Sequence, residues 1–74
     1  MNSKHYKYYK KLGLNIAYYR KDKRFTQEQL AESLNVDRTT IGKIELAISS
    51  ASLDVIFSLA DALDVPVYKF FEFR

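Results

Sequence analysis

The sequence predicts a small all-α domain of five helices and no strand. Two observations lead to this fold class: apolar residues recur at helical spacing along most of the chain, and residues that start or stop helices separate these segments. A chain of 74 residues is long enough for one domain with one core. Its hydrophobic fraction of 47% is typical of a globular protein and argues against disorder.

The first helix is expected to begin at Lys7 or Lys10 and to end at Lys23. Residues 1–11 are therefore either a basic, tyrosine-rich N-terminal extension or the start of this helix, and residues 12–74 form the domain.

The second helix is predicted over Gln27–Leu34, between two clear boundary signals. Thr26 and Gln29 have the spacing of a capping box, in which each side chain accepts a hydrogen bond from the other residue's backbone N–H. Asn35 follows the last apolar residue and suits the left-handed conformation that ends a helix.

The third helix is predicted from Arg38 to about Leu46, with Asp37 as its N-cap. Ile41, Ile44 and Ile48 are spaced i, i+3 and i+7, so we expect them to be buried on one face. The opposite face carries Arg38, Thr39, Gly42, Lys43 and Leu46. A helix with this polar outer face, joined to its predecessor by a tight turn, has the form of a helix that enters a DNA groove.

Ser52 is a suitable cap for a fourth helix, Leu53–Leu63. Its predicted buried stripe is Leu53, Ile56, Leu59, Ala60 and Leu63. Pro66 then opens a short fifth helix, Val67–Glu72.

The C-terminal segment holds more aromatic surface than one short helix can hide. We therefore expect Tyr68, Phe71 and Phe73 to contact a second subunit. The alternative is that Phe71 and Phe73 fold back on the tyrosines of the first helix.

At these residues the chain resembles the Xre/Cro family of helix-turn-helix DNA-binding regulators, which have the five-helix fold of lambda-repressor-like domains. The matching residues are Thr26-Gln27, Leu30-Ala31, Leu34, Val36, Ile41 and Ile44-Glu45, and the resemblance extends from about Leu12 to Phe73. It implies a transcriptional regulator that binds double-stranded DNA. A domain this small makes few contacts, so we expect a homodimer on a two-fold operator. The absence of Cys and of an apolar signal-type stretch at the N-terminus favours the cytoplasm. Within the family, the segment 35–40 and the terminal Phe-Phe-Glu look like the controller proteins of restriction–modification systems.

The resemblance implies a base-reading role for four residues of the third helix. The family positions that touch bases correspond here to Arg38, Thr39, Gly42 and Lys43. Arginine and lysine can donate to guanine O6 and N7, and a threonine methyl can pack on a thymine methyl. A glycine would let the helix backbone come close to the base edges. The alternative is that these are ordinary exposed helix residues.

Phosphate contacts are expected from two places. Gln27 matches a family position that holds a phosphate, and it lies at a helix N-terminus, where N–H groups attract anions. Thr40 can join either set of contacts. Residues 1–24 carry a net charge of +7 and residues 25–74 one of −4, so Lys10 and Lys11 are expected to follow a phosphate backbone. The alternative is a solvated basic tail.

Arg20 and Glu45 match a buried ion pair of the phage repressors in this family, which ties the first helix to the end of the third. Glu45 falls on the apolar face of its helix, where an unpaired charge would be costly. The alternative is a solvated pair at the rim. The loop Leu46–Ser52 departs from the family because it lacks Gly, Pro and basic residues, and Ala17 stands where the family often has Arg.

The sequence provides no catalytic, metal or cofactor site. There is no Cys, and His5, the one histidine, has no carboxylate at a useful spacing. No small-molecule ligand is evident, and no apolar run is long enough to cross a membrane. The alternative function is a protein-interaction module, an antitoxin or anti-repressor, favoured by Leu46 and Ile48 near the recognition face.

Overall fold

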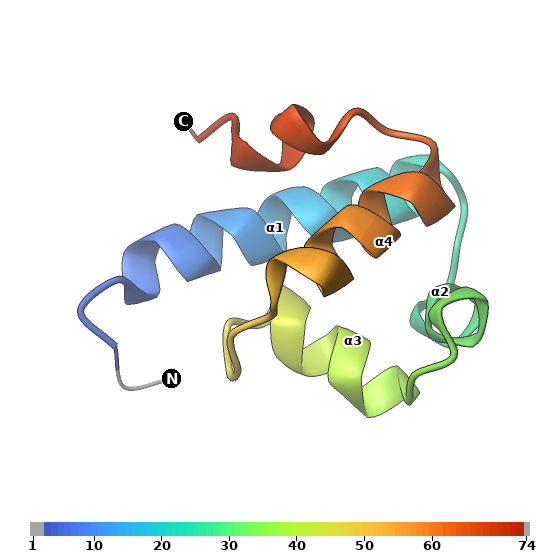
Figure 1. Ribbon diagram of the computed structural model, residues 1–74, viewed down its shortest axis with the longest axis horizontal. Coiled ribbons are helices and arrows are strands. Elements are labelled where there is room, and N and C mark those ends of the chain that lie inside the picture. Colours follow the sequence, from blue (N-terminus) through green and yellow to red (C-terminus); the bar gives the residue numbers. More distant parts are fainter. Residues whose placement is uncertain (1–2, 74) are drawn as a thin grey trace.

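The structure, a computed structural model, describes residues 3–73. It consists of α1 (Tyr6–Asp22), α2 (Gln27–Leu34), α3 (Arg38–Glu45), α4 (Leu53–Leu63) and a 3₁₀ helix, η1 (Val67–Phe71), with no strand in this part of the chain. The longest helix, α1, runs through the middle of the molecule, with α2 and α3 on one side and η1 on the other (Figure 1). The predicted all-α class is confirmed.

The helix boundaries follow the capping signals closely. Thr26 and Gln29 form the predicted capping box, with both hydrogen bonds 3.0 Å long. The Ser52 hydroxyl accepts from the N–H of Val55 at 3.2 Å. Asp37 occupies the N-cap of α3, but its side chain makes no capping hydrogen bond.

Three other boundaries differ slightly from the prediction. The first helix begins at Tyr6, before both predicted starts, so residues 6–11 are its opening turns. It ends at Asp22, one residue early, and α3 ends at Glu45, also one residue early.

The core lies between α1, α2, α3 and α4, and η1 closes it. Its fully buried large side chains are Ile16, Leu30, Ile41, Ile56, Leu59, Leu63 and Phe70. The predicted stripe of α4 is right except for Leu53, which is 62% exposed. Leu53 is the first residue of its helix and lines a surface groove with Tyr8 and Phe71, where much of its side chain stays in solvent.

The predicted fifth helix is a 3₁₀ helix that ends at Phe71, one residue early. The side chain of Asn15 in α1 donates to the carbonyl of Phe70 at 2.9 Å and to that of Glu72 at 3.2 Å. These carbonyl groups are therefore satisfied by α1 and need no further helical turn. The arrangement fixes Phe70 in the core.

The loop after α3 overturns one prediction. Ile48 does not join Ile41 and Ile44 in the core but is 54% exposed. The chain adopts the left-handed conformation at Ala47, with φ of 57°, so the helical period stops at Glu45. Ala47 is buried in place of Ile48, at a position where a residue with a Cβ is strained.

Both α2 and α4 end on an exposed residue in the left-handed conformation, Asn35 with φ of 56° and Asp64 with φ of 53°. Asp64 also places a negative charge at a helix C-terminus, where the helix dipole repels it. We expect Asp64→Gly to raise the free energy of unfolding by about 0.5–1 kcal/mol, by relieving both effects.

Urea denaturation measures this change, and Asn35→Gly is the matched control. Asn35 has the same backbone conformation but no charge, so its replacement should gain less. Equal gains from the two variants would show that the charge at position 64 has no effect.

Candidate nucleic-acid interface

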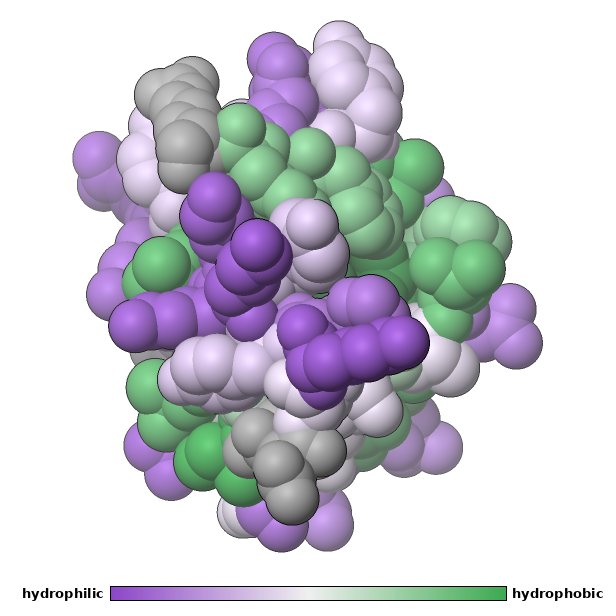
Figure 2. All heavy atoms as spheres, turned by 90° about the vertical axis from the view of Figure 1, so that its left-hand side faces the viewer, coloured by the Kyte–Doolittle hydropathy of each residue, from purple (hydrophilic) through white to green (hydrophobic). Residues whose placement is uncertain are grey.

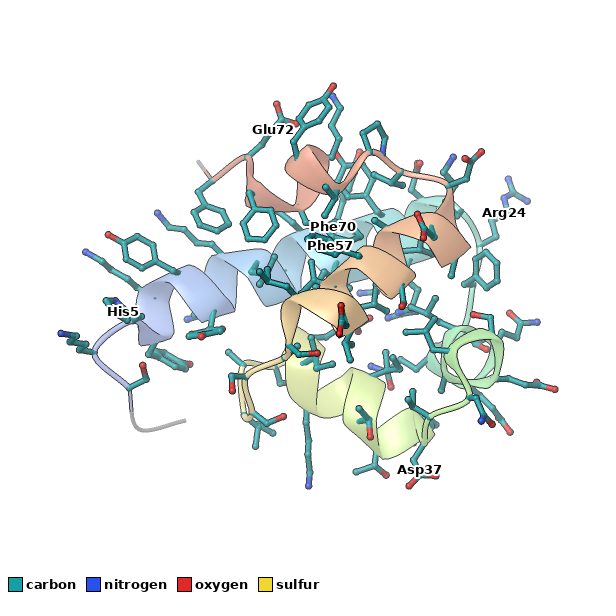
Figure 3. The ribbon with its side chains drawn as sticks, viewed as in Figure 1. His5, Arg24, Asp37, Phe57, Phe70 and Glu72 are labelled. Carbon is teal, nitrogen blue, oxygen red and sulfur yellow. The ribbon has the colours of Figure 1, made fainter. Side chains whose placement is uncertain are left out.

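The turn between α2 and α3 packs the two helices steeply against one another and leaves one face of α3 in solvent. Leu30 and Ala31 of α2 and Ile41 of α3 are buried at the crossing. The N–H of Val36 donates to the carbonyl of Ala31 at 3.0 Å and closes the turn. In Figure 3 α3 forms the edge of the molecule farthest from η1, with Asp37 at its start.

The residues predicted to read bases lie together on this outer face. Arg38, Thr39 and Lys43 are exposed, and Thr40 and Gly42 are half-buried. None of the three exposed side chains makes a hydrogen bond or ion pair within residues 3–73. The face is therefore a set of donors directed at solvent from a rigid helix.

The structure places Gln27 beside this face. A Cβ built on Gly42 would lie 3.7 Å from Gln27 Oε1 and 3.9 Å from Gln27 Nε2. The carboxamide of Gln27 therefore lies against α3 at the one position without a side chain.

Arg20 and Glu45 form the expected buried ion pair. Arg20 Nε lies 2.7 Å from Glu45 Oε2, Arg20 Nη2 lies 3.1 Å from Oε1, and the two residues are 8% and 7% exposed. Arg20 Nη1 also donates to the carbonyl of Phe25 at 2.9 Å. The pair joins α1, the start of α2 and the end of α3, and no buried side-chain polar atom in the described chain lacks a partner.

Sequence reasoning missed the importance of Gly13. A Cβ at this position would lie 2.4 Å from the carbonyl oxygen of Glu45 and 2.7 Å from that of Ile44. Only a glycine allows α1 to cross the end of α3 at this distance. The available signal was a glycine in the middle of a helix, which is destabilising unless close packing requires it.

The two lysines predicted to contact phosphate lie on different sides of α1. Lys10 precedes Gly13 by three residues and so shares the face that meets α3. Lys11 borders a groove between α1 and η1, away from α3. Both are exposed.

One of the C-terminal aromatic residues packs on α1, and two others remain exposed. Phe73 stacks on Tyr8 of α1, with ring centroids 6.2 Å apart and planes 17° apart, as the fold-back alternative expects. Phe71 and Tyr68 remain 43% and 61% exposed. Figure 2 shows hydrophobic surface on this end of the molecule, spread between the C-terminal segment and α4. Leu53 of α4 and Phe71 are both exposed and line one groove.

Comparison with known proteins decides what kind of domain this is. A family model described as helix-turn-helix matches residues 16–70. The chain belongs to the helix-turn-helix family of Xre/Cro type. As a member of this family it is a DNA-binding transcriptional regulator and not an enzyme.

Three solved structures show how closely this helix-turn-helix regulator follows its relatives. The restriction–modification controller protein C.AhdI from Aeromonas hydrophila is 33% identical, with a TM-score of 0.87 over 93% of this chain and 100% of its own. The hypothetical transcription factor NHTF from Neisseria is 29% identical, with a TM-score of 0.84 over 89% of this chain and 76% of its own.

The third structure, the clp gene regulator ClgR from C. glutamicum, is 26% identical, with a TM-score of 0.80 over 84% of this chain and 80% of its own. A search of curated proteins found no match. Within the described residues of the regulator, no helix has the length and apolar character needed to cross a membrane.

Proposed function

We propose that this regulator reads the major groove of an operator with α3, acts in the cytoplasm as a homodimer, and serves as the controller of a restriction–modification system. The observation that carries the proposal is the outer face of α3, where exposed polar side chains stand on a helix fixed by α1 and α2. The likeness to C.AhdI, which covers all of that chain, supports the controller role. Transcripts of linked restriction and modification genes should change when the regulator is deleted.

The chemistry of the α3 face suits base recognition. The Arg38 and Lys43 side chains can donate to guanine O6 and N7, and the Thr39 methyl can pack on a thymine methyl. Within α3 the acidic residue is Glu45, which is buried, so the exposed charges of the helix are the positive ones of Arg38 and Lys43, although Asp37 is exposed at its N-cap. Because Gly42 has no side chain, the carboxamide of Gln27 can lie close to the backbone of α3 at this position.

We expect Arg38→Ala or Lys43→Ala to weaken operator binding by about 1–3 kcal/mol and to relax the preference at particular bases. Selection of bound sequences from a random DNA pool, repeated with each variant, measures both effects. Lys69→Ala is the matched control, because Lys69 lies in η1, on the far side of α1 from α3. An unchanged selected motif with the Arg38 and Lys43 variants would rule out α3 as the reading helix.

The proposed phosphate contacts are Gln27, Thr40, Lys10 and Lys11. Their substitution should affect DNA binding differently from substitution of the base-reading residues. Substitution by Ala should weaken binding to all sequences evenly. For each lysine that touches a phosphate, the slope of log affinity against log salt should become shallower by about one unit. We expect the larger effect at Lys10, which shares the face of α1 that meets α3.

The proposed dimer uses the hydrophobic end of the molecule. Tyr68, Phe71 and Phe73 are its proposed contact residues. Phe71 and Phe73 line an apolar groove of about 320 Å³ together with Leu53 of α4 and Tyr8 of α1. A two-fold contact would place each groove against the same surface of the second copy and bury Phe71. Two copies would also double the DNA contacts of a small domain.

We expect Phe71→Glu to shift the protein from dimer to monomer, because it places a charge in the proposed interface. Analytical ultracentrifugation at micromolar concentration gives the association state. Leu14→Glu is the matched control: Leu14 is also an exposed apolar residue, but it lies on α1 outside this groove. A wild-type regulator that sediments as a monomer and still binds its operator would refute the dimer.

A further inference from the structure

The carboxylate of Glu45 serves more than the ion pair. In addition to the two bonds from Arg20, its Oε1 accepts a hydrogen bond of 3.0 Å from Nε2 of Gln27. Arg20 Nη2 and Gln27 Nε2 therefore meet on the same oxygen. Three residues from α1, α2 and α3 thus form one hydrogen-bonded chain.

These hydrogen bonds fix the side chain of Gln27 in one orientation. Gln27 is the first residue of α2 and half-buried, and its carboxamide is held between Glu45 on one side and Gly42 on the other. One N–H of the carboxamide is used by Glu45, so the second N–H and the carbonyl oxygen remain for another partner. A glutamine on a free surface would have to give up its rotamer freedom when it binds, and a fixed one has already done so.

The orientation of the carboxylate depends in turn on Arg20. The guanidinium donates to both carboxylate oxygens and is itself anchored by the carbonyl of Phe25. Because a guanidinium presents its donors in a rigid plane, it sets the plane of the carboxylate. A lysine at position 20 would keep the charge but would not impose this geometry.

We propose that Arg20 and Glu45 are positioning residues for DNA contact, which hold the carboxamide of Gln27 at the junction of α2 and α3. Both residues are buried, so they act through Gln27 and do not touch DNA themselves. The effect on DNA affinity rests on the proposed function, whereas the positioning of Gln27 is a property of the free protein.

The free protein gives the first test. Exchange of the Gln27 side-chain amide protons, followed by NMR, should be about tenfold faster in Arg20→Lys and in Glu45→Gln than in the wild type, since a hydrogen bond to a charged group is lost or misaligned. Glu32→Gln is the matched control, because Glu32 is an exposed carboxylate of α2. Unchanged exchange in both test variants overturns the proposal.

DNA affinity gives the second test, at a temperature where circular dichroism shows every variant to be folded. Arg20→Lys should weaken binding several-fold, and the double variant Arg20→Lys with Gln27→Ala should bind no worse than Gln27→Ala alone. Arg24→Lys, at an exposed arginine, is the control. Additive losses overturn the proposal, since they would mean that Arg20 acts independently of Gln27.

The two tests separate the two ideas. A wild-type protein that binds no DNA sequence would refute the proposed function, and the NMR experiment would still decide whether Arg20 and Glu45 hold Gln27.

Discussion

Gly13→Ala is expected to lower the free energy of unfolding by about 3 kcal/mol, the upper end of the usual cost of overpacking. The added methyl group would meet the carbonyl oxygens of Glu45 and Ile44 at 2.4 Å and 2.7 Å. These are backbone atoms of α3, so no side-chain rotation can make room and α1 must move away from α3. Urea denaturation followed by circular dichroism measures the loss.

Gly42→Ala is the matched control, because it makes the same change in a neighbouring helix. Its Cβ would have 3.7 Å to the nearest atom, an ordinary contact. Alanine is the better helix former, so this variant should gain about 0.5–1 kcal/mol. A gain in both variants would contradict the close crossing of α1 and α3 at Gly13.

Arg20→Ala and Glu45→Ala should each lower the free energy of unfolding by about 3–5 kcal/mol, because the remaining partner becomes an unpaired buried charge. A cost of this size is a large share of the stability of a domain, which is about 5–15 kcal/mol in total. The double variant should cost less than the two single variants together. Thermal and urea denaturation of the wild type, the two single variants and the double variant give the four stabilities of this double-mutant cycle.

The exposed pair Lys69–Glu72 provides a comparison within the same chain. Its side chains are 39% and 47% exposed and its charged atoms are 3.5 Å apart, so Lys69→Ala should have little effect on stability. Small, additive losses of stability in the Arg20 and Glu45 variants would mean that the Arg20–Glu45 pair behaves like the exposed Lys69–Glu72 pair and is not buried.

The sequence was sufficient where local chemistry decides the structure. The capping box at Thr26, the left-handed Asn35 and the cap at Ser52 each depend on atoms within a few residues, so their patterns are visible in the chain. The family resemblance supplied roles for Gln27 and for the Arg20–Glu45 pair. The bond between Gln27 and Glu45 was not foreseen, because it depends on the angle at which α2 crosses α3.

The features that the sequence did not predict depend, like this bond, on how distant segments pack together. Ile48 fits the helical period of α3, but the left-handed Ala47 reverses the chain before that period can apply. Gly13 is distant in sequence from the α3 carbonyl groups that require it. The Asn15 bonds that end η1 join segments at opposite ends of the described chain. Only tertiary packing determines these three features.

The contact between Asn15 and Phe70 also has a consequence for how the domain folds. It joins residues 55 positions apart and connects the first helix to the last element, so it closes a loop that contains α2, α3 and α4. Closing so long a loop costs chain entropy, so we expect the docking of η1 to be a late step in folding. Until it docks, the pocket that Phe70 fills stays open to water. The core on which the helix-turn-helix rests is therefore complete only when the two ends of the domain meet.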